Sequence, residues 1–169
     1  MAFVQNNVLC SISGRPISFP IFKTYKMLQF SSDMDLVLAS PENFLAECRG
    51  ANNSLVCIGI ESESEPEQRI VFLKKILAAL QLELDRDTVY CSLDPTAKGS
   101  FFQLLKKKGI EKMVVFGLSP RHFGLGFSAQ LYEPLGFYGC KFVFSEKLSV
   151  VEADQARKAK LWTALKAIF

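Results

Sequence analysis

From residue 54 onward, short apolar runs of strand length alternate with stretches of helical periodicity. The apolar runs are "SLVCIGI" (54–60), "TVYCSL" (88–93), "KMVVFGL" (112–118) and "CKFVFS" (140–145). Continuous apolar runs are typical of parallel strands that are covered on both faces. Strands that alternate with helices build right-handed βαβ units. The sequence therefore predicts an α/β three-layer sandwich with a mostly parallel four-stranded sheet.

Three helices are expected between and after these strands. The stretch "RIVFLKKILAALQL" repeats apolar residues at helical spacing, and Pro66 before it suits a first helical turn. The second helix, "GSFFQLLKKKG" (99–109), is expected to end at Gly109. The third spans 149–168, where Ser149 and Glu152 have the spacing of a capping box. Its expected inner face is Leu161, Trp162, Leu165 and Ile168.

The length of 169 residues fits one domain. We expect an α/β domain over 54–169 and an amino-terminal extension, residues 1–53, packed on it. No apolar run approaches the length of a membrane-spanning helix, and the amino terminus "MAFVQNNVLCSISGRP" lacks the pattern of a secretory signal. The expected location is the cytoplasm.

The five cysteines are scattered through the chain. No two have metal-ligand spacing, and Cys57, Cys91 and Cys140 fall in or beside apolar runs. We interpret them as small buried thiols and not as a disulfide framework. No metal and no cofactor are expected.

The charge is unevenly distributed. Residues 98–169 hold 12 Lys and Arg against 5 Asp and Glu, whereas residues 1–97 hold 8 against 12. Such a balance allows a basic face toward nucleic acid or an acidic partner, although exposed lysines on helices are mostly solvated.

Few residues have the pattern of a catalytic site. Glu61, Glu63 and Glu65 follow the first apolar run, where a carboxylate could activate water, but a solvated acidic loop is the simpler interpretation. His122 is the one histidine and follows the run 112–118, so it is either a base or a local helix-start contact. "GLGFSA" (124–129) resembles a dinucleotide fingerprint but does not join a strand directly to a helix.

Ser145, Glu146 and Lys147 follow the last apolar run, at the strand end where α/β proteins bind ligands. They form no complete catalytic set by themselves. We interpret them as the turn between a strand and the last helix.

Over residues 54–168 the chain resembles the uracil-DNA glycosylase superfamily. "FLKKILAALQLELDRDTVYCSLD", "LLKKKGIEKMVVFGLSP" and "ARKAKLWTALKAI" are similar to its first helix and second strand, its third strand and its closing helix. "KFVFSEKL" corresponds to the strand and loop that carry the catalytic histidine of active members, and here those positions read Ser145-Glu146-Lys147-Leu148. The glycine-rich acidic motif of active members is also missing after Gly59. The resemblance therefore implies a degenerate, non-catalytic member.

Within that superfamily, "KAKLWTAL" (158–165) looks like the closing helix of the psi subunit of bacterial DNA polymerase III. This resemblance implies an accessory protein of DNA replication or repair, with a clamp-loader or other replication subunit as partner and DNA as a second candidate. The basic residues expected to contact a partner or nucleic acid are Lys106, Lys107, Lys108, Arg121, Lys141, Lys147, Arg157, Lys158 and Lys160.

Two other functions stay open. One is an atypical uracil-DNA glycosylase that uses Glu61 or Glu63 with His122. The other is a small-molecule-binding domain with a pocket at the strand ends around Gly59, Gly117 and Ser145.

Overall fold

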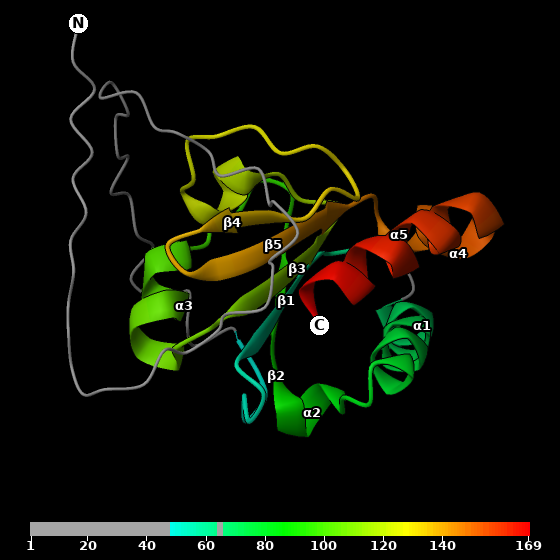
Figure 1. The fold of residues 1–169 in the computed structure, drawn as a ribbon, viewed down its shortest axis with the longest axis horizontal. Coiled ribbons are helices and arrows are strands. Elements are labelled where there is room, and N and C mark those ends of the chain that lie inside the picture. The colour runs from blue at the N-terminus through cyan, green and yellow to red at the C-terminus, as the bar shows by residue number, and fades with distance from the viewer. Residues whose placement is uncertain (1–47, 64–65) are drawn as a thin grey trace, which may run out of the picture.

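A computed structural model describes residues 48–63 and 66–169 of the chain (Figure 1). The elements, in chain order, are β1 (Val56–Glu61), α1 (Pro66–Ala79), α2 (Leu84–Asp87), β2 (Thr88–Leu93), α3 (Phe101–Lys108), β3 (Lys112–Phe116), the 3-10 helix η2 (Pro120–Phe123), β4 (Leu135–Phe137), β5 (Cys140–Ser145), α4 (Leu148–Ala153) and α5 (Gln155–Ile168). Strands and helices alternate, so the predicted α/β class is confirmed. No helix within the described residues is long and apolar enough to cross a membrane.

The five strands form one mixed sheet in the order β2-β1-β3-β5-β4. The first four are parallel, and β4 runs antiparallel to β5 at one edge. The prediction of four strands was therefore one short. The missed strand, β4, has only three residues, and a two-residue turn joins it to β5. In that turn Tyr138 and Gly139 both have positive φ, 48° and 75°, as hairpin turns of this length favour.

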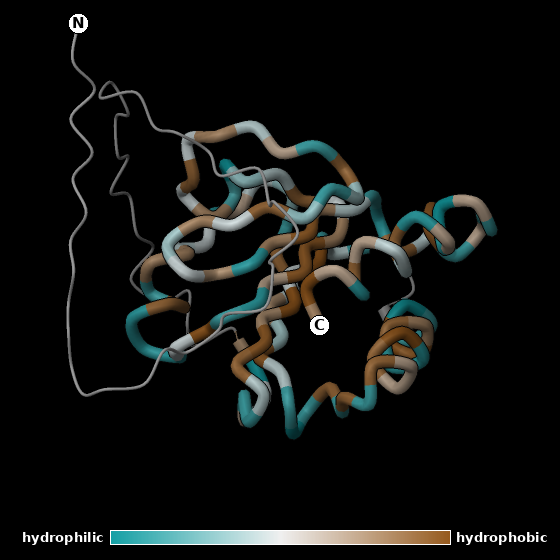
Figure 2. The backbone as a smooth tube through the Cα atoms, in the orientation of Figure 1, coloured by the Kyte–Doolittle hydropathy of each residue, from teal (hydrophilic) through white to brown (hydrophobic). Residues whose placement is uncertain are grey.

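Successive residues of the strands supply two apolar cores, one on each face of the sheet. The strands in the middle of the molecule are accordingly mostly hydrophobic in sequence, brown in Figure 2. On one face Phe101 and Leu104 of α3 pack with Phe142 of β5. On the other face Leu73 of α1 and Leu165 of α5 belong to the second core. Helices thus cover both faces, and the central strands are buried because side chains of both orientations meet a helix layer.

The closing helical region differs from the prediction. Instead of one helix over 149–168 there are two, α4 and α5, with a break at Asp154. The Asp154 carboxylate accepts hydrogen bonds from the backbone N–H groups of Ala156 and Arg157 and so caps α5. Ser149 lies inside α4 and not at its cap, so the predicted capping box is wrong. Residues 152–160 contain no large apolar side chain, so apolar periodicity gives no sign of the break.

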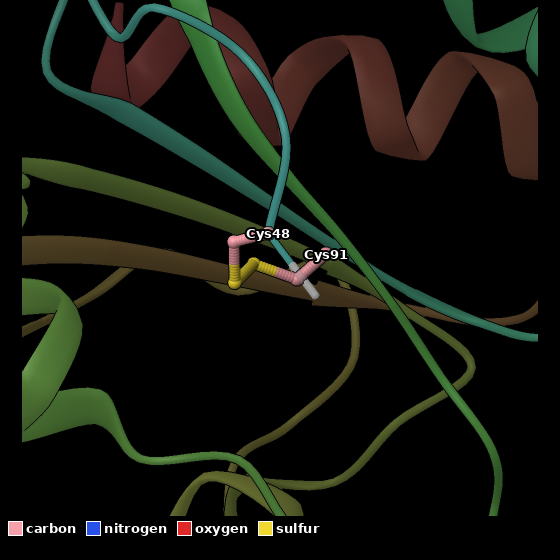
Figure 3. Close-up of a disulfide and its surroundings, with 2 residues drawn as sticks. All are labelled: Cys48 and Cys91. Carbon is pink, nitrogen blue, oxygen red and sulfur yellow. A yellow bond between two sulfur atoms is a disulfide. The ribbon is translucent and has the colours of Figure 1, made fainter. Parts of the chain in front are cut away.

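Cys48 and Cys91 form a disulfide, contrary to the prediction that Cys91 is a buried free thiol (Figure 3). The cause is a register that the sequence does not display. Arg49 and Tyr90 exchange two backbone hydrogen bonds in an antiparallel bridge, which places their neighbours Cys48 and Cys91 opposite each other with Cα atoms 4.5 Å apart. Cys57 and Cys140 are buried free thiols, as predicted.

The predicted amino-terminal extension, residues 1–53, falls mostly outside the described residues, which begin at Cys48. Its last six residues run along β2 and α2. Ala51 and Asn53 donate backbone hydrogen bonds to the carbonyl groups of Asp85 and Arg86.

Candidate functional site at the carboxyl edge of the sheet

The chain reverses its direction of strand addition at β1. From β1 it crosses to β2 on one side, and it then returns to β3 on the other. In an open α/β sheet, the crevice beyond the carboxyl ends of the two strands at such a reversal is the usual ligand site. Glu61 ends β1 and Gly117 follows β3, so these residues mark the crevice in this protein.

An ion pair closes this crevice. Lys147, which follows β5, donates a hydrogen bond from Nζ to Glu61 Oε1 at 2.6 Å. The Glu61 side chain is 8% exposed and that of Lys147 is 48% exposed, so the carboxylate is buried while the ammonium reaches solvent. The hydrogen bond to Glu61 raises the pKa of Lys147, and the nearby Glu63 adds to this shift. Glu61 therefore lies buried against a fixed cation.

Gly117 makes room for the ion pair. Its φ is +76°, and its N–H donates to the Ser145 carbonyl at 3.0 Å. A Cβ at this position would lie 2.7 Å from Glu61 Oε2 and 2.9 Å from Glu61 Cβ. Only glycine fits both the backbone conformation and the contact.

Next to the ion pair, a cavity of about 380 Å³ opens between the ends of β3 and β5. The residues that line it are Gly117, Leu118, Ser119, Pro120, Ala129, Leu131, Phe144, Ser145, Glu146, Lys147 and Val150. Most are apolar or contribute backbone. Of the predicted pocket glycines, Gly117 lines the cavity, whereas Gly59 faces the ring of Phe123, 2.7 Å from where a Cβ would lie.

Ser145 brings an unsatisfied hydroxyl to this cavity. The residue is 1% exposed, and its Oγ has no hydrogen-bond partner among the described residues. The Tyr132 phenol lies near it but donates instead to Glu146 Oε2 at 2.7 Å. Burial, followed by the hydrogen bond to Glu146, raises the pKa of Tyr132. A buried hydroxyl without a partner is uncommon and marks a place for a polar ligand atom.

Glu146 is held by two partners. Besides the Tyr132 phenol, it accepts a hydrogen bond from Arg157 of α5 at 2.6 Å. Arg157 also contacts Asp154, so the loop after β5 is fixed to the start of α5. Glu146 and Lys147 both serve structural ion pairs, in agreement with the interpretation of Ser145-Glu146-Lys147 as a turn.

His122 makes local contacts through both ring nitrogens. Its Nδ1 accepts a hydrogen bond from the backbone N–H of Ser119 at 3.0 Å, and its Nε2 lies 3.0 Å from the Pro95 carbonyl. The ring therefore carries its proton on Nε2 and ties the start of η2 to the loop after β2. This geometry matches the helix-start interpretation and not the role of a base.

The candidate acid–base residues thus form no catalytic group. Glu61 pairs with Lys147, and Glu63 is half-buried in the loop that follows β1. His122 is occupied by backbone groups, and it does not line the cavity. Among residues 48–63 and 66–169, no three His, Cys, Asp or Glu side chains are grouped as metal ligands would be.

The basic residues predicted to bind a partner or nucleic acid lie in three places. Lys106, Lys107 and Lys108 end α3, near the amino edge of the sheet, where Lys141 is the second residue of β5. Arg121 and Lys147 lie at the carboxyl edge, in η2 and after β5. Arg157, Lys158 and Lys160 belong to the first turns of α5. The structure therefore brings the nine together on no single face.

The sequence analysis did not predict which residues contact each other at this site. Glu61 and Lys147 lie 86 residues apart, and only the sheet order brings them together. The one available signal was their place at the ends of two predicted strands, because parallel strands end at the same edge. Tyr132 lies in a segment without periodicity, and no signal identified it.

Comparisons with known proteins provide no family for this geometry: no family model matches the chain, and no curated protein matches it.

Proposed function

We propose that the protein is a non-catalytic binding protein of bacterial DNA replication or repair, similar to the psi subunit of the DNA polymerase III clamp-loader assembly. The observation that carries the non-catalytic part is the Glu61–Lys147 ion pair across the crevice between β1 and β3. A glycosylase needs that space for an extruded nucleotide and an acid or base free to act on it. Here the carboxylate is buried against a lysine.

The assignment to replication rests on the resemblance of residues 54–168. In that resemblance the closing helix corresponds to α5, on which Trp162 and Lys158 are half-buried beside α1. The degenerate uracil-DNA glycosylase-like fold is part of the same proposal, because its catalytic histidine position falls on the Ser145-Glu146-Lys147 turn.

Two assays test the proposal. Purified protein incubated with uracil-containing single-stranded DNA is expected to leave no abasic sites. Clear excision that Glu61→Gln abolishes would instead establish the atypical glycosylase. In the second assay, tagged protein is used to capture partners from native cell extract, and polymerase or clamp-loader subunits are expected to come with it. If no replication or repair subunit is captured, the assignment to DNA replication or repair fails.

DNA binding is a separate part of the same proposal. If the basic residues contact phosphates, each lysine replaced by glutamine should reduce the salt dependence of binding by about one unit of slope. Lys106→Gln and Lys158→Gln test the amino edge and α5 independently. No detectable binding to single- or double-stranded DNA at low salt would remove DNA from the partners.

A second candidate function is favoured by the cavity at the ends of β3 and β5. Its volume of about 380 Å³ lies within the range of small-molecule sites, and the buried Ser145 hydroxyl offers a hydrogen bond inside a mostly apolar lining. The ligand class would be a nucleobase, whose flat ring would pack against the apolar lining while one of its polar groups bonds to the Ser145 hydroxyl. Thermal shift with free bases and nucleosides tests this, with Ser145→Ala as the variant that should lose the shift. An unchanged melting temperature with all of them would leave the cavity without this role.

A further inference from the structure

The outer side of the α1 and α5 layer carries a groove that the candidate site does not include. Both helices lie on the same face of the sheet, and α4 packs against each of them (Figure 1). Between them lies a cavity of about 240 Å³. Its lining residues are Phe72, Lys75, Ile76 and Ala79 of α1, and Lys158, Leu161, Trp162 and Leu165 of α5.

The groove is apolar at its base. Leu161 and Leu165 are buried against the sheet, whereas Phe72, Ile76 and Trp162 are only half-buried. Phe72 and Ile76 are four residues apart and therefore form one ridge along α1. Two helices with an apolar furrow between them are the usual receptor for the apolar face of a third helix. Tryptophan is also among the residues that contribute most to protein–protein binding.

The rim of the groove is basic. Lys158 Nζ lies 5.9 Å from the centre of the Phe72 ring, and Lys166 Nζ lies 5.2 Å from that of Trp162. Lysines at such positions cover aromatic faces while the ammonium stays in solvent. The rim therefore presents cations directly beside the apolar floor.

The surrounding surface of α1 and α5 is also positively charged. After Glu67, neither α1 nor α5 contains an acidic residue. Two arginines of these helices form ion pairs: Arg69 with Glu152, and Arg157 with Glu146 and Asp154. Within residues 48–63 and 66–169 no ion pair neutralises the five lysines of this surface, which are Lys74, Lys75, Lys158, Lys160 and Lys166. The groove therefore complements an apolar and acidic partner.

We propose that this groove binds an acidic amphipathic helix of a protein partner. Apolar side chains at helical spacing would enter between Phe72 and Trp162, and the flanking Asp and Glu would face the lysines of the rim. The proposal rests on the proposed function, since it names the kind of segment by which a partner is held. A nucleic acid is the weaker candidate here, because the lysines already cover the faces of Phe72 and Trp162 on which bases would stack.

The test uses the full chain and a fluorescein-labelled synthetic peptide of about 18 residues, long enough to form a helix, with Leu at heptad positions a and d and Glu at most others. Trp162 is the only tryptophan of the chain, so its emission reports directly on the groove. We expect saturable binding by anisotropy, a change in Trp162 emission, and weaker binding as salt rises. The same peptide with Lys for Glu should not bind.

Variants locate the binding surface. Lys75→Glu combined with Lys158→Glu should weaken peptide binding about tenfold or more. Lys75 is exposed and Lys158 is half-buried at the rim of the groove, so circular dichroism is used to verify that the fold remains. Ile76→Gln removes part of the apolar ridge and should weaken binding without changing the charge. The control, Lys98→Glu in the segment before α3, reverses an exposed charge away from the groove and should bind as the parent does; Lys75→Glu alone is its single-charge match.

Three outcomes overturn the groove proposal: equal binding of the Lys peptide, equal affinity of the groove variants and the Lys98→Glu control, or displacement of the peptide by an oligo-dT strand. Capture from native extract separates the two proposals. If the peptide binds and no replication subunit is captured, the groove stands and the replication assignment fails. If replication subunits are captured equally by the parent and by the Lys75→Glu, Lys158→Glu variant, the replication assignment stands and the groove proposal fails.

Discussion

Adding one methyl group at Gly117 perturbs the centre of the closed crevice. Gly117→Ala introduces a Cβ at a residue whose φ is +76°. The new atom would lie 2.7 Å from Glu61 Oε2, 2.9 Å from Glu61 Cβ and 3.0 Å from Lys147 Cγ. Glu61 is buried against Lys147, so neither neighbour can move away without disturbing the ion pair.

Two contributions determine how much Gly117→Ala lowers the free energy of unfolding. A left-handed conformation costs a residue with a Cβ about 1–2 kcal/mol relative to glycine. Overpacking by a methyl group in a filled site adds about 1–3 kcal/mol. The free energy of unfolding should therefore fall by about 2–5 kcal/mol. Gly139→Ala is the matched control, because Gly139 has φ +75° but no atom within 4 Å of the added Cβ. It should cost only the first term, about 1–2 kcal/mol.

Urea denaturation followed by Trp162 emission measures both variants in the same way. The difference between them isolates the contact with the ion pair. In Gly117→Ala with Lys147→Ala, the clash with Lys147 Cγ is absent, so the two changes should be less than additive. If Gly117→Ala and Gly139→Ala lose equal stability, the crevice is not filled as described, and the main support for a non-catalytic protein is lost.

Three further predictions concern the rest of the fold. Reducing the Cys48–Cys91 disulfide, which links residues 43 apart, should lower the free energy of unfolding by up to about 4 kcal/mol, and Cys48→Ser should remove the effect of reductant on the urea midpoint. The backbone N–H groups of Arg157 and Ala156 lower the pKa of Asp154, so the stability that its carboxylate gives the fold is complete above the ordinary value of 3.8 and is lost as pH falls through the lower folded value. Asp154→Asn keeps a cap without titrating and should flatten this loss. If the stability of Asp154→Asn falls below pH 3.8 as steeply as that of the parent, the prediction is wrong. Burial raises the pKa of Cys140 to about 12 and also raises that of Cys57, so both should resist alkylation in the native protein and react only in denaturant, as peptide mapping by mass spectrometry can verify.

Much of the fold follows from local sequence pattern, because the buried strands are continuous apolar runs. The bounds predicted for β2 and β5 agree with the structure, and the end of α3 at Gly109 is also correct, since its φ of +63° suits glycine. Pro66 begins α1 as predicted. These features depend on neighbouring residues along the chain, which a single sequence displays.

The remaining features depend on residues that are distant in sequence. β4 is too short to show alternation and exists because β5 offers an edge. The disulfide depends on the register of Arg49 against Tyr90. The role of Glu61 depends on Lys147, which lies at the end of another strand. For each of these, the pairing and not the composition decides the outcome, so the strand ends could be named as a candidate site while their contacts could not.

The two edge strands of the sheet are β2 and β4. Beside β2, Arg49 occupies the backbone groups of Tyr90, and beyond β5 lie the three-residue β4 and a single bridge from Leu131 to Phe144. Sheets with long open margins recruit strands from other molecules, and brief or covered margins prevent this. Association by strand addition is therefore disfavoured along both margins of this sheet. Under the proposed function, a protein partner would bind the helical faces instead, where side-chain chemistry, and not backbone pairing, selects which protein is held.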